Sequence, residues 1–267
     1  MTTSKRRGKK SPEELWREAL TKPHGSPFGW LPSSPRCSIC GSPFKGVGGA
    51  VVRMMGIQPW RKNPTLCTMC YNELPVGGTE VDIAVLFADI RGSTALGEQM
   101  GPTAFAGSLN AFYRAATQAL VPHRAIIDKF MGDAVIALFI PFSGSTYRQN
   151  CVLAAVDMMR GFEATASGNG RITLGMGLHA GPAFVGKVGE GEVNDFTALG
   201  DTVNTASRLQ HEAAPGEIVL SEEIYGSVLS LFPGLESRTV EIRGKQDPMM
   251  IRILRGEQSS STHSGMA

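Results

Sequence analysis

The segment Asp128-Lys129-Phe130-Met131-Gly132-Asp133 joins two apolar runs, residues 124–130 and 133–140, and these runs decide the fold. Both runs have the length and the apolar composition of strands. Met131-Gly132 lies between them, and a glycine at this place is typical of a hairpin turn. We therefore expect two adjacent antiparallel strands.

Helical and strand patterns continue on either side of this hairpin. A strand over 81–88 precedes a helix over 101–121, and a helix over 147–165 precedes a strand over 171–180. The resulting order is ferredoxin-like, which predicts an α+β domain with an antiparallel sheet and helices on one face. The other predicted elements are a Gly-rich β-hairpin over 182–197, a helix over 201–213, and strands over 237–243 and 249–254.

Composition excludes several classes of protein. An apolar share of 42% is too high for a disordered chain. The longest apolar run, Ala134–Ile140, is far short of the roughly 20 residues that cross a bilayer. Five cations lie within residues 4–10, but no apolar segment follows them as in a secretory signal. We therefore expect a cytoplasmic protein without a membrane span, whose basic start is a solvated tail.

Two aspartates are predicted to meet at one edge of the sheet. Asp89 ends the first strand, and Asp133 starts the strand beside it, although 44 positions separate them. Two adjacent carboxylates repel unless a cation lies between them, and Mg²⁺ prefers oxygen ligands and also binds phosphates. The alternative is that Asp89 caps a helix and Asp133 is an ordinary turn residue.

Two further segments are suited to a phosphorylated ligand. Gly92-Ser93-Thr94 places small residues at a helix start, where backbone N–H groups can approach an anion. Asn204 and Arg208 are four positions apart and share a helix face, so an amide and a guanidinium could hold a sugar and a phosphate. A solvated polar stripe is the alternative for this pair.

These segments together resemble the catalytic domain of class III adenylate and guanylate cyclases. The resemblance covers roughly residues 80–255. It extends to His179-Ala180-Gly181-Pro182, Val185-Gly186 and Gly189, which are similar to the family's segment before its dimer arm. It implies the fold of that catalytic domain.

The resemblance implies a role for each matching residue. Asp89 and Asp133 match the aspartates that bind two Mg²⁺ or Mn²⁺ ions per active site, and the Ile90 carbonyl adds a ligand. Asn204 matches the asparagine that orients the ribose. Arg208 matches the arginine that stabilises the transition state at the α-phosphate.

Further matches concern the base and the terminal phosphates. Lys129 matches the lysine that reads adenine, where guanine-using members carry an acidic residue. Thr197 stands where many adenylate cyclases have an aspartate, which resembles the class IIIb subgroup, and its hydroxyl can still accept a hydrogen bond. Either Arg243 or Lys245 meets the terminal phosphates. The resemblance thus implies an adenylate cyclase that converts ATP to 3′,5′-cyclic AMP and pyrophosphate.

The same resemblance implies a homodimer. In this family the metal aspartates and the base-reading residues act on one nucleotide from opposite protomers. This chain carries both sets, so it should form a head-to-tail dimer with two composite sites.

Four cysteines precede the cyclase-like region. Cys37 and Cys40 form one CxxC pair, and Cys67 and Cys70 form another. Because disulfides are rare in a reducing compartment, this spacing predicts a closed, structural Zn²⁺ site, and we expect a treble-clef-like module. Cys151 lies on an apolar helix face and is expected to be buried core.

The role of this module has two readings. It could brace the helix of residues 12–20 against the catalytic domain, with Trp60 and Met54-Met55 as packing anchors. It could instead bind a partner or nucleic acid through Arg53, Arg61 and Lys62, but these cations are few and lack interleaved aromatic residues.

The sequence therefore divides into four parts. The predicted parts are a basic tail, short helix and Pro-rich connector over 1–35, a zinc-binding module over 36–74, a cyclase domain over 80–255, and a disordered tail over 256–267. The rival interpretations are a catalytically weak cyclase homologue that serves in regulation or dimerisation, a zinc-finger nucleic-acid binder with a nucleotide-sensing domain, and a guanylate cyclase. The metal aspartates argue against the first and Lys129 against the last.

Overall fold

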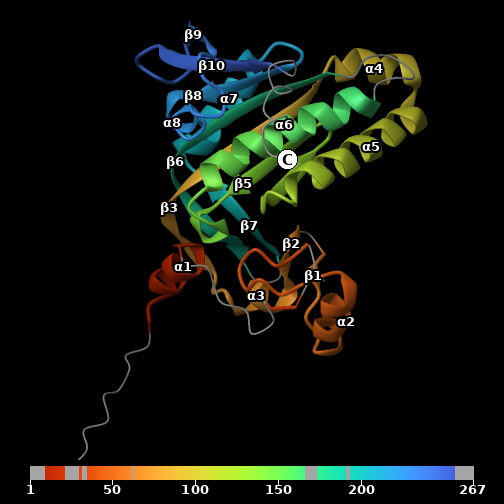
Figure 1. Ribbon diagram of the computed structural model, residues 1–267, viewed down its shortest axis with the longest axis vertical. Helices are drawn as coiled ribbons and strands as arrows, with labels where there is room; N and C mark the ends of the chain where they lie inside the picture. Colours follow the sequence, from red (N-terminus) through yellow and green to blue (C-terminus); the bar gives the residue numbers. More distant parts are fainter. Residues whose placement is uncertain are drawn as a thin grey trace, which may run out of the picture.

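A 15-residue strand, β3, lies at the centre of an eight-stranded sheet in the computed structural model (Figure 1). The structure describes residues 10–21, 30–31, 35–61, 63–165, 173–190 and 193–255. The predicted basic tail up to residue 9, most of the Pro-rich connector, Lys62 and the predicted tail over 256–267 lie outside the described residues.

The described part of the chain contains eight α-helices, one 3₁₀ turn and ten strands. They are α1 (Pro12–Thr21), α2 (Gly46–Met54), β1 (Pro59–Trp60), β2 (Asn63–Cys67), α3 (Thr68–Glu73), β3 (Gly77–Arg91), α4 (Ser93–Met100), α5 (Pro102–Leu120), β4 (Ile126–Met131), β5 (Ala134–Phe139), the 3₁₀ turn η1 (Pro141–Ser143), α6 (Tyr147–Thr165), β6 (Thr173–Glu190), β7 (Val193–Leu199), α7 (Asp201–Glu212), β8 (Glu217–Ser221), α8 (Glu222–Tyr225), β9 (Glu236–Val240) and β10 (Met249–Arg255).

The strand order confirms the predicted ferredoxin-like fold. β3, α5, β4, β5, α6 and β6 follow one another in the chain, and their strands lie in the order β4-β5-β3-β6 with antiparallel neighbours. The sheet continues through β8 and β10 to β9, while β7 pairs with the far half of β6 as a protruding arm.

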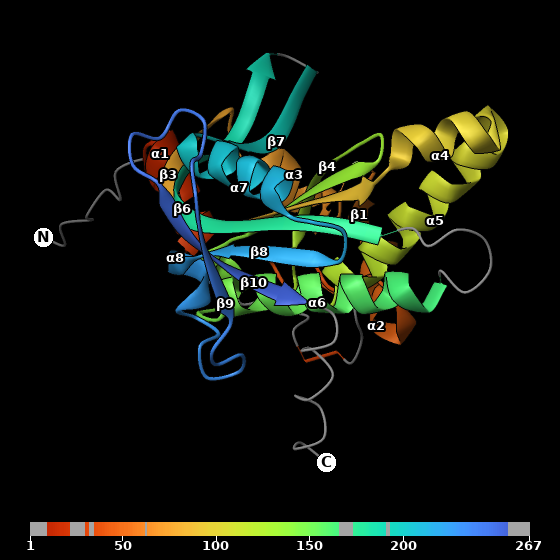
Figure 2. The ribbon, with the colours of Figure 1, turned by 90° about the horizontal axis from the view of Figure 1, so that it is seen from above.

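The prediction of helices on one face only is wrong. Alternate residues of β3 point to opposite faces, and both sets are apolar. Leu86 and Ile90 pack with α5 and α6, whereas Ile83 and Phe87 pack with α1, α7 and the cysteine module. Figure 2 shows α6 and α7 on opposite sides of the sheet. A central strand that is apolar on both sides needs a cover on each.

Several predicted boundaries also differ from the structure. Residues 173–190 and 193–199 form one long strand and its partner, β6 and β7, rather than a strand followed by a separate hairpin. The helix expected over 101–121 is preceded by a separate helix, α4, because Gly101 has a φ of +76° and interrupts the helix. β8 was not predicted; it pairs parallel to β6 and all five of its residues are buried.

The amino-terminal elements agree with two local predictions. The Ser11 hydroxyl accepts from the Glu14 backbone N–H, and the Glu14 carboxylate accepts from the Ser11 N–H, which is the capping box expected for α1. Cys151, on α6, is fully buried in the core, as expected. Among the described helices, none combines the length and apolarity needed to span a bilayer.

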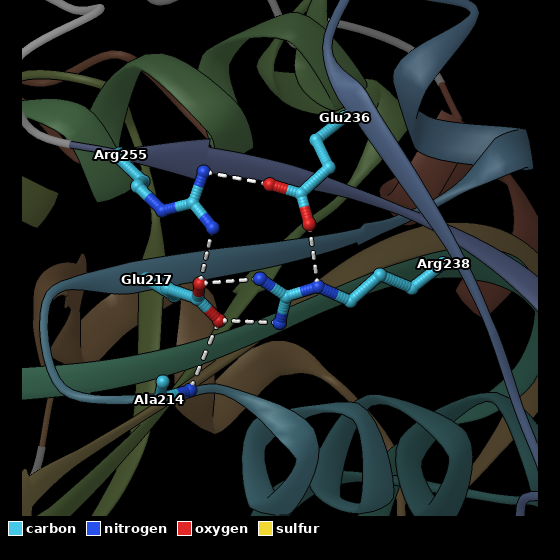
Figure 3. A network of polar contacts seen from close by, with 5 residues as sticks. All are labelled: Ala214, Glu217, Glu236, Arg238 and Arg255. Atoms are coloured by element: carbon cyan, nitrogen blue, oxygen red, sulfur yellow. Dashed lines mark hydrogen bonds and ion pairs between the residues drawn. The ribbon is translucent and has the colours of Figure 1, made fainter.

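A polar network ties the last three strands together (Figure 3). Glu217 on β8 is buried and accepts two hydrogen bonds from Arg238 on β9, at 3.0 and 2.8 Å. It also accepts from Arg255 at 2.8 Å and from the Ala214 N–H at 3.1 Å. Burial alone would raise the pKa of Glu217, but these donors together hold it below its ordinary value of 4.5. Glu236 binds the same two arginines from a more exposed position.

This network predicts acid-sensitive stability. Because the folded-state pKa of Glu217 is lowered, its contribution is complete above pH 4.5 and is lost as the pH falls through the folded-state value. We expect Glu217→Gln to lower the free energy of unfolding at pH 7 by about 1–3 kcal/mol. The difference from wild type should shrink in urea titrations at lower pH. Glu236→Gln, at the exposed end, should cost less; equal losses would contradict this account.

Candidate active site

The β3–β5 register brings the two predicted metal aspartates together. Asp89 on β3 is paired with Ala134 on β5, so Asp133 lies directly beside the end of β3. The Ile90 N–H donates to the Asp133 carbonyl at 3.1 Å. Gly132 has a φ of +60° and makes the tight turn that positions Asp133. Both side chains are partly exposed at this edge of the sheet.

The electrostatics of this pair suit a cation. Burial, and then the charge of Asp133, raise the pKa of Asp89. Within the protein, the Ser93 hydroxyl donates a hydrogen bond to Asp133. Carboxylate and carbonyl oxygens are the ligands that divalent cations such as Mg²⁺ prefer. Asp89, Asp133 and the Ile90 carbonyl could therefore hold such ions.

A cleft opens next to these carboxylates. Its volume is about 560 Å³, which is in the range of small-ligand sites. Ser93 and Thr94, from the first turn of α4, line it together with Gly132 and Asp133. Gly92 precedes the helix with a φ of +74°. The N–H groups of the first turn of a helix lack intrahelical partners, so the anion site expected at Gly92-Ser93-Thr94 remains a prediction that this position allows.

A second group of predicted residues lies on and beside α7. Asn204 is exposed, whereas Arg208 is half-buried. Arg208 Nη1 is buried without a hydrogen-bond partner among the described residues. The turn at Gly244 packs against this guanidinium, so that a Cβ at Gly244 would lie 3.3 Å from Nη1. A buried guanidinium with an unused donor is suited to an anionic ligand.

The two candidate phosphate cations differ in their surroundings. Lys245 forms an ion pair with Asp201, at the start of α7. Arg243 is exposed on the same loop. The structure therefore brings both residues close to the α7 group, at the turn that contacts Arg208.

The third group contains the predicted base-reading residues and one further residue, Asp128. Thr197 on β7 donates a hydrogen bond from Oγ1 to Asp128 Oδ2 at 3.2 Å. Lys129 Nζ lies 3.5 Å from the same oxygen. Sequence reasoning missed Asp128; its signal is two consecutive polar residues, Asp128 and Lys129, that break the alternation of an otherwise apolar strand.

These three groups are separate within one chain. Among the described residues, no hydrogen bond or ion pair joins the Asp89–Asp133 pair to Lys129, Thr197, Asn204 or Arg208. The Asp89–Asp133 pair, which we call the cation-binding half, thus makes no direct polar contact in the described residues with the other two groups, which together we call the other half.

The four predicted zinc ligands converge at the other end of the sheet. The Sγ atoms of Cys37, Cys40, Cys67 and Cys70 all lie within 4.8 Å of one another. The first pair lies in a tight turn and the second pair at the start of α3. Backbone N–H groups of Cys67 and Cys70 donate to the sulfurs of Cys37 and Cys67, both at 3.3 Å. Four sulfurs at these distances could hold one tetrahedral metal ion.

The cysteine module contacts the strands that carry the base-reading group. Asn63 Nδ2 donates to the Ile127 carbonyl, next to Asp128, at 2.8 Å. The Tyr71 hydroxyl donates to the Asn194 carbonyl on β7 at 3.1 Å, and Trp60 stacks on the Tyr71 ring. Lys187 Nζ donates to the Leu74 carbonyl at 2.7 Å. The module thus packs against β4 and the β6–β7 arm.

The expected packing anchors of the module are only partly correct. Trp60 packs as predicted, but Met54 and Met55 are 91% and 58% exposed. The α2 helix points these side chains outward, so they do not anchor α1. Instead Trp16 of α1 packs on Phe196 and donates to the Pro75 carbonyl at 3.1 Å.

Comparisons with known proteins agree with this fold. The family model described as the adenylate and guanylate cyclase catalytic domain matches residues 78–256. This chain therefore belongs to the adenylate and guanylate cyclase family. The expected class III cyclase catalytic fold is thereby confirmed, and the membership supports a nucleotide-binding lyase.

The sequence relatives of this chain include adenylate cyclases. An adenylate cyclase of Anabaena cylindrica is 30% identical over 184 residues, which cover 63% of this chain and 36% of the relative. Adenylate cyclase 1 of Rhizobium meliloti is 31% identical over 48% of this chain and 20% of its own length. The matched region thus spans about a third or less of these relatives.

Solved structures give the same picture of the fold. The guanylyl cyclase Cya2 has a TM-score of 0.63 and 26% identity, over 66% of this chain and 93% of that one. The adenylyl cyclase CyaB from P. aeruginosa has a TM-score of 0.59 and 26% identity, over 66% and 94%.

Proposed function

We propose that this protein is an adenylate cyclase that converts ATP to 3′,5′-cyclic AMP and pyrophosphate at a homodimer interface. The observation that carries the proposal is that Asp89 and Asp133 lie side by side at the sheet edge, next to a cleft bordered by the start of α4. Lys129 and Thr197 favour ATP, in keeping with the adenylate cyclases among the relatives.

The reaction forms a bond between the ribose 3′-oxygen and the α-phosphorus. The bond from that phosphorus to the pyrophosphate oxygen breaks, pyrophosphate leaves, and solvent water takes up the proton of the 3′-hydroxyl. Asp89, Asp133 and the Ile90 carbonyl would hold two Mg²⁺ or Mn²⁺ ions. When bound, such ions lower the pKa of the 3′-hydroxyl and neutralise phosphate charge.

The chain's own residues orient the nucleotide around this bond. Backbone N–H groups over Gly92–Thr94 donate hydrogen bonds to phosphate oxygens. Asn204 orients the ribose, and the free Nη1 of Arg208 donates to the α-phosphate as negative charge grows on it. Arg243 or Lys245 forms an ion pair with the terminal phosphates.

The separation of the two half-sites within one chain supports a head-to-tail dimer. Each nucleotide would lie between the cation-binding half of one protomer and the other half of its partner. A two-fold axis then generates two equivalent sites.

The specific test mixes two inactive variants. Asp89→Ala and Lys129→Ala should each lower the rate of cyclic AMP formation by about 10²–10³. In an equimolar mixture half the dimers are mixed, and each has one intact site, so the rate should recover to about a quarter of the wild-type value. The measurement is cyclic nucleotide formed from ATP with Mg²⁺ or Mn²⁺.

The matched control mixes Asp89→Ala with Asp133→Ala. Both changes damage the same half, so no intact site forms and no recovery is expected. Recovery in the control, or none in the test mixture, would contradict the composite site. GTP is the second candidate substrate, because Cya2 is a guanylyl cyclase; the same assay with GTP distinguishes the two.

We also propose that the four-cysteine cluster holds a structural Zn²⁺ ion that braces the base-reading half. The support is the convergence of the sulfurs and the contacts of Asn63, Tyr71 and Leu74 with β4 and the arm.

Removal of one zinc ligand provides the test. Purified protein should contain about one zinc ion per chain, and Cys70→Ser should lose most of it and melt roughly 5–10 °C lower. Cys151→Ala removes a buried cysteine outside the cluster and should keep the metal. The proposal would be refuted if the purified wild type contained no metal and Cys70→Ser melted at the same temperature as the wild type.

A further inference from the structure

Asp128 occupies an unusual position in β4. The register between β4 and β5 shifts between Ile127 and Lys129, which makes Asp128 the extra residue of a β-bulge. A bulge re-aims the side chains around it. The Asp128 side chain is only 5% exposed and lies against β7, whereas Lys129 is 46% exposed.

The contacts of this carboxylate fix the direction of one hydrogen bond. An ionised carboxylate accepts hydrogen bonds and cannot donate them. The Thr197 hydroxyl therefore has to give its proton to Asp128 Oδ2, at 3.2 Å. The oxygen of that hydroxyl then has only lone pairs left to offer a ligand. Lys129 Nζ, 3.5 Å from the same carboxylate oxygen, supports the ionised form and has only donors to offer.

We propose that Asp128 is the positioning residue that sets base selectivity, by holding Thr197 as an acceptor beside the donor Lys129. This inference rests on the proposed function. An acceptor next to a donor complements a 6-aminopurine, which has an amino donor at C6 and an acceptor at N1. A 6-oxopurine has the opposite pattern, with an acceptor at C6 and a donor at N1.

Two features of the surroundings favour a fixed arrangement. Burial, the largest influence, raises the pKa of Asp128, and the Lys129 charge and the Thr197 hydrogen bond oppose this effect. The carboxylate therefore depends on these two partners to remain charged. Asn63, itself buried, holds the carbonyl of Ile127 just before the bulge.

The experiment compares kcat/KM for ATP, GTP and inosine triphosphate. In Asp128→Asn the amide can donate to Thr197, which frees the hydroxyl to donate to a 6-oxo group. We expect the ratio of kcat/KM for ATP over inosine triphosphate to fall about tenfold. A merely structural role would lower all three values together. Asp195→Asn, which removes an exposed charge from β7, serves as the control and should keep the ratio.

A second set of variants keeps the test independent of the folding of Asp128→Asn. Thr197→Ser keeps a hydroxyl and should retain the ratio, whereas Thr197→Val should lose it. If Asp128 acts through Thr197, adding Asp128→Asn to Thr197→Val should change the ratio no further.

The outcomes separate this inference from the proposed function. A wild-type enzyme that prefers ATP, with a folded Asp128→Asn variant of unchanged ratio, overturns the inference and leaves the cyclase activity intact. An unchanged ratio in Thr197→Val overturns it as well. A wild-type protein that forms no cyclic nucleotide from any of the three refutes the proposed function itself.

Discussion

The antiparallel pairing of β3 with β5 is the constraint on which the site depends. It sets Asp89 opposite Ala134 and lets the Ile90 N–H reach the Asp133 carbonyl. Because side chains alternate along a strand, a slip of one residue would turn Asp89 to the other face and exchange the two apolar sets of β3, so that neither set would fit the elements packed on it. Both faces of this strand are covered, so the register that buries them also fixes the two carboxylates.

The rest of the site is organised by α7 and by the β6–β7 arm. α7 carries Asn204 and Arg208 across β6, and the arm places Thr197 against Asp128. The cysteine module packs on the same strands through Asn63 and Tyr71. Asp89 and Asp133 lie at one end of this sheet, and the cysteine cluster packs on other strands of the same sheet. Unfolding of the cysteine module would displace the base-reading residues first. In the described residues, the printed polar contacts of the module reach the strands of those residues and not the Asp89–Asp133 edge.

Much of this arrangement could be predicted from the sequence, for identifiable reasons. The hairpin at Gly132 and the ferredoxin-like order follow from local patterns, and together they imply that Asp89 and Asp133 meet. β8 was missed because a strand buried on both faces shows no alternation, so Glu217–Ser221 resembles any short apolar run. Asp128 was missed because a bulge depends on strand pairing, which a single strand's sequence does not specify. The outward direction of Met54 depends on where α2 lies relative to the sheet, which local periodicity does not determine.

The central claim is that Asp89 and Asp133 jointly bind divalent cations around a nucleotide. Titration of Mn²⁺ by electron paramagnetic resonance, with a non-cyclisable ATP analogue present, tests it directly. The account predicts about two bound ions per chain for the wild type and for Glu98→Gln, which changes another carboxylate of the same cleft. The double variant Asp89→Asn with Asp133→Asn should bind no ions beyond those held by the free analogue. Equal binding by the wild type and the double variant would contradict the account.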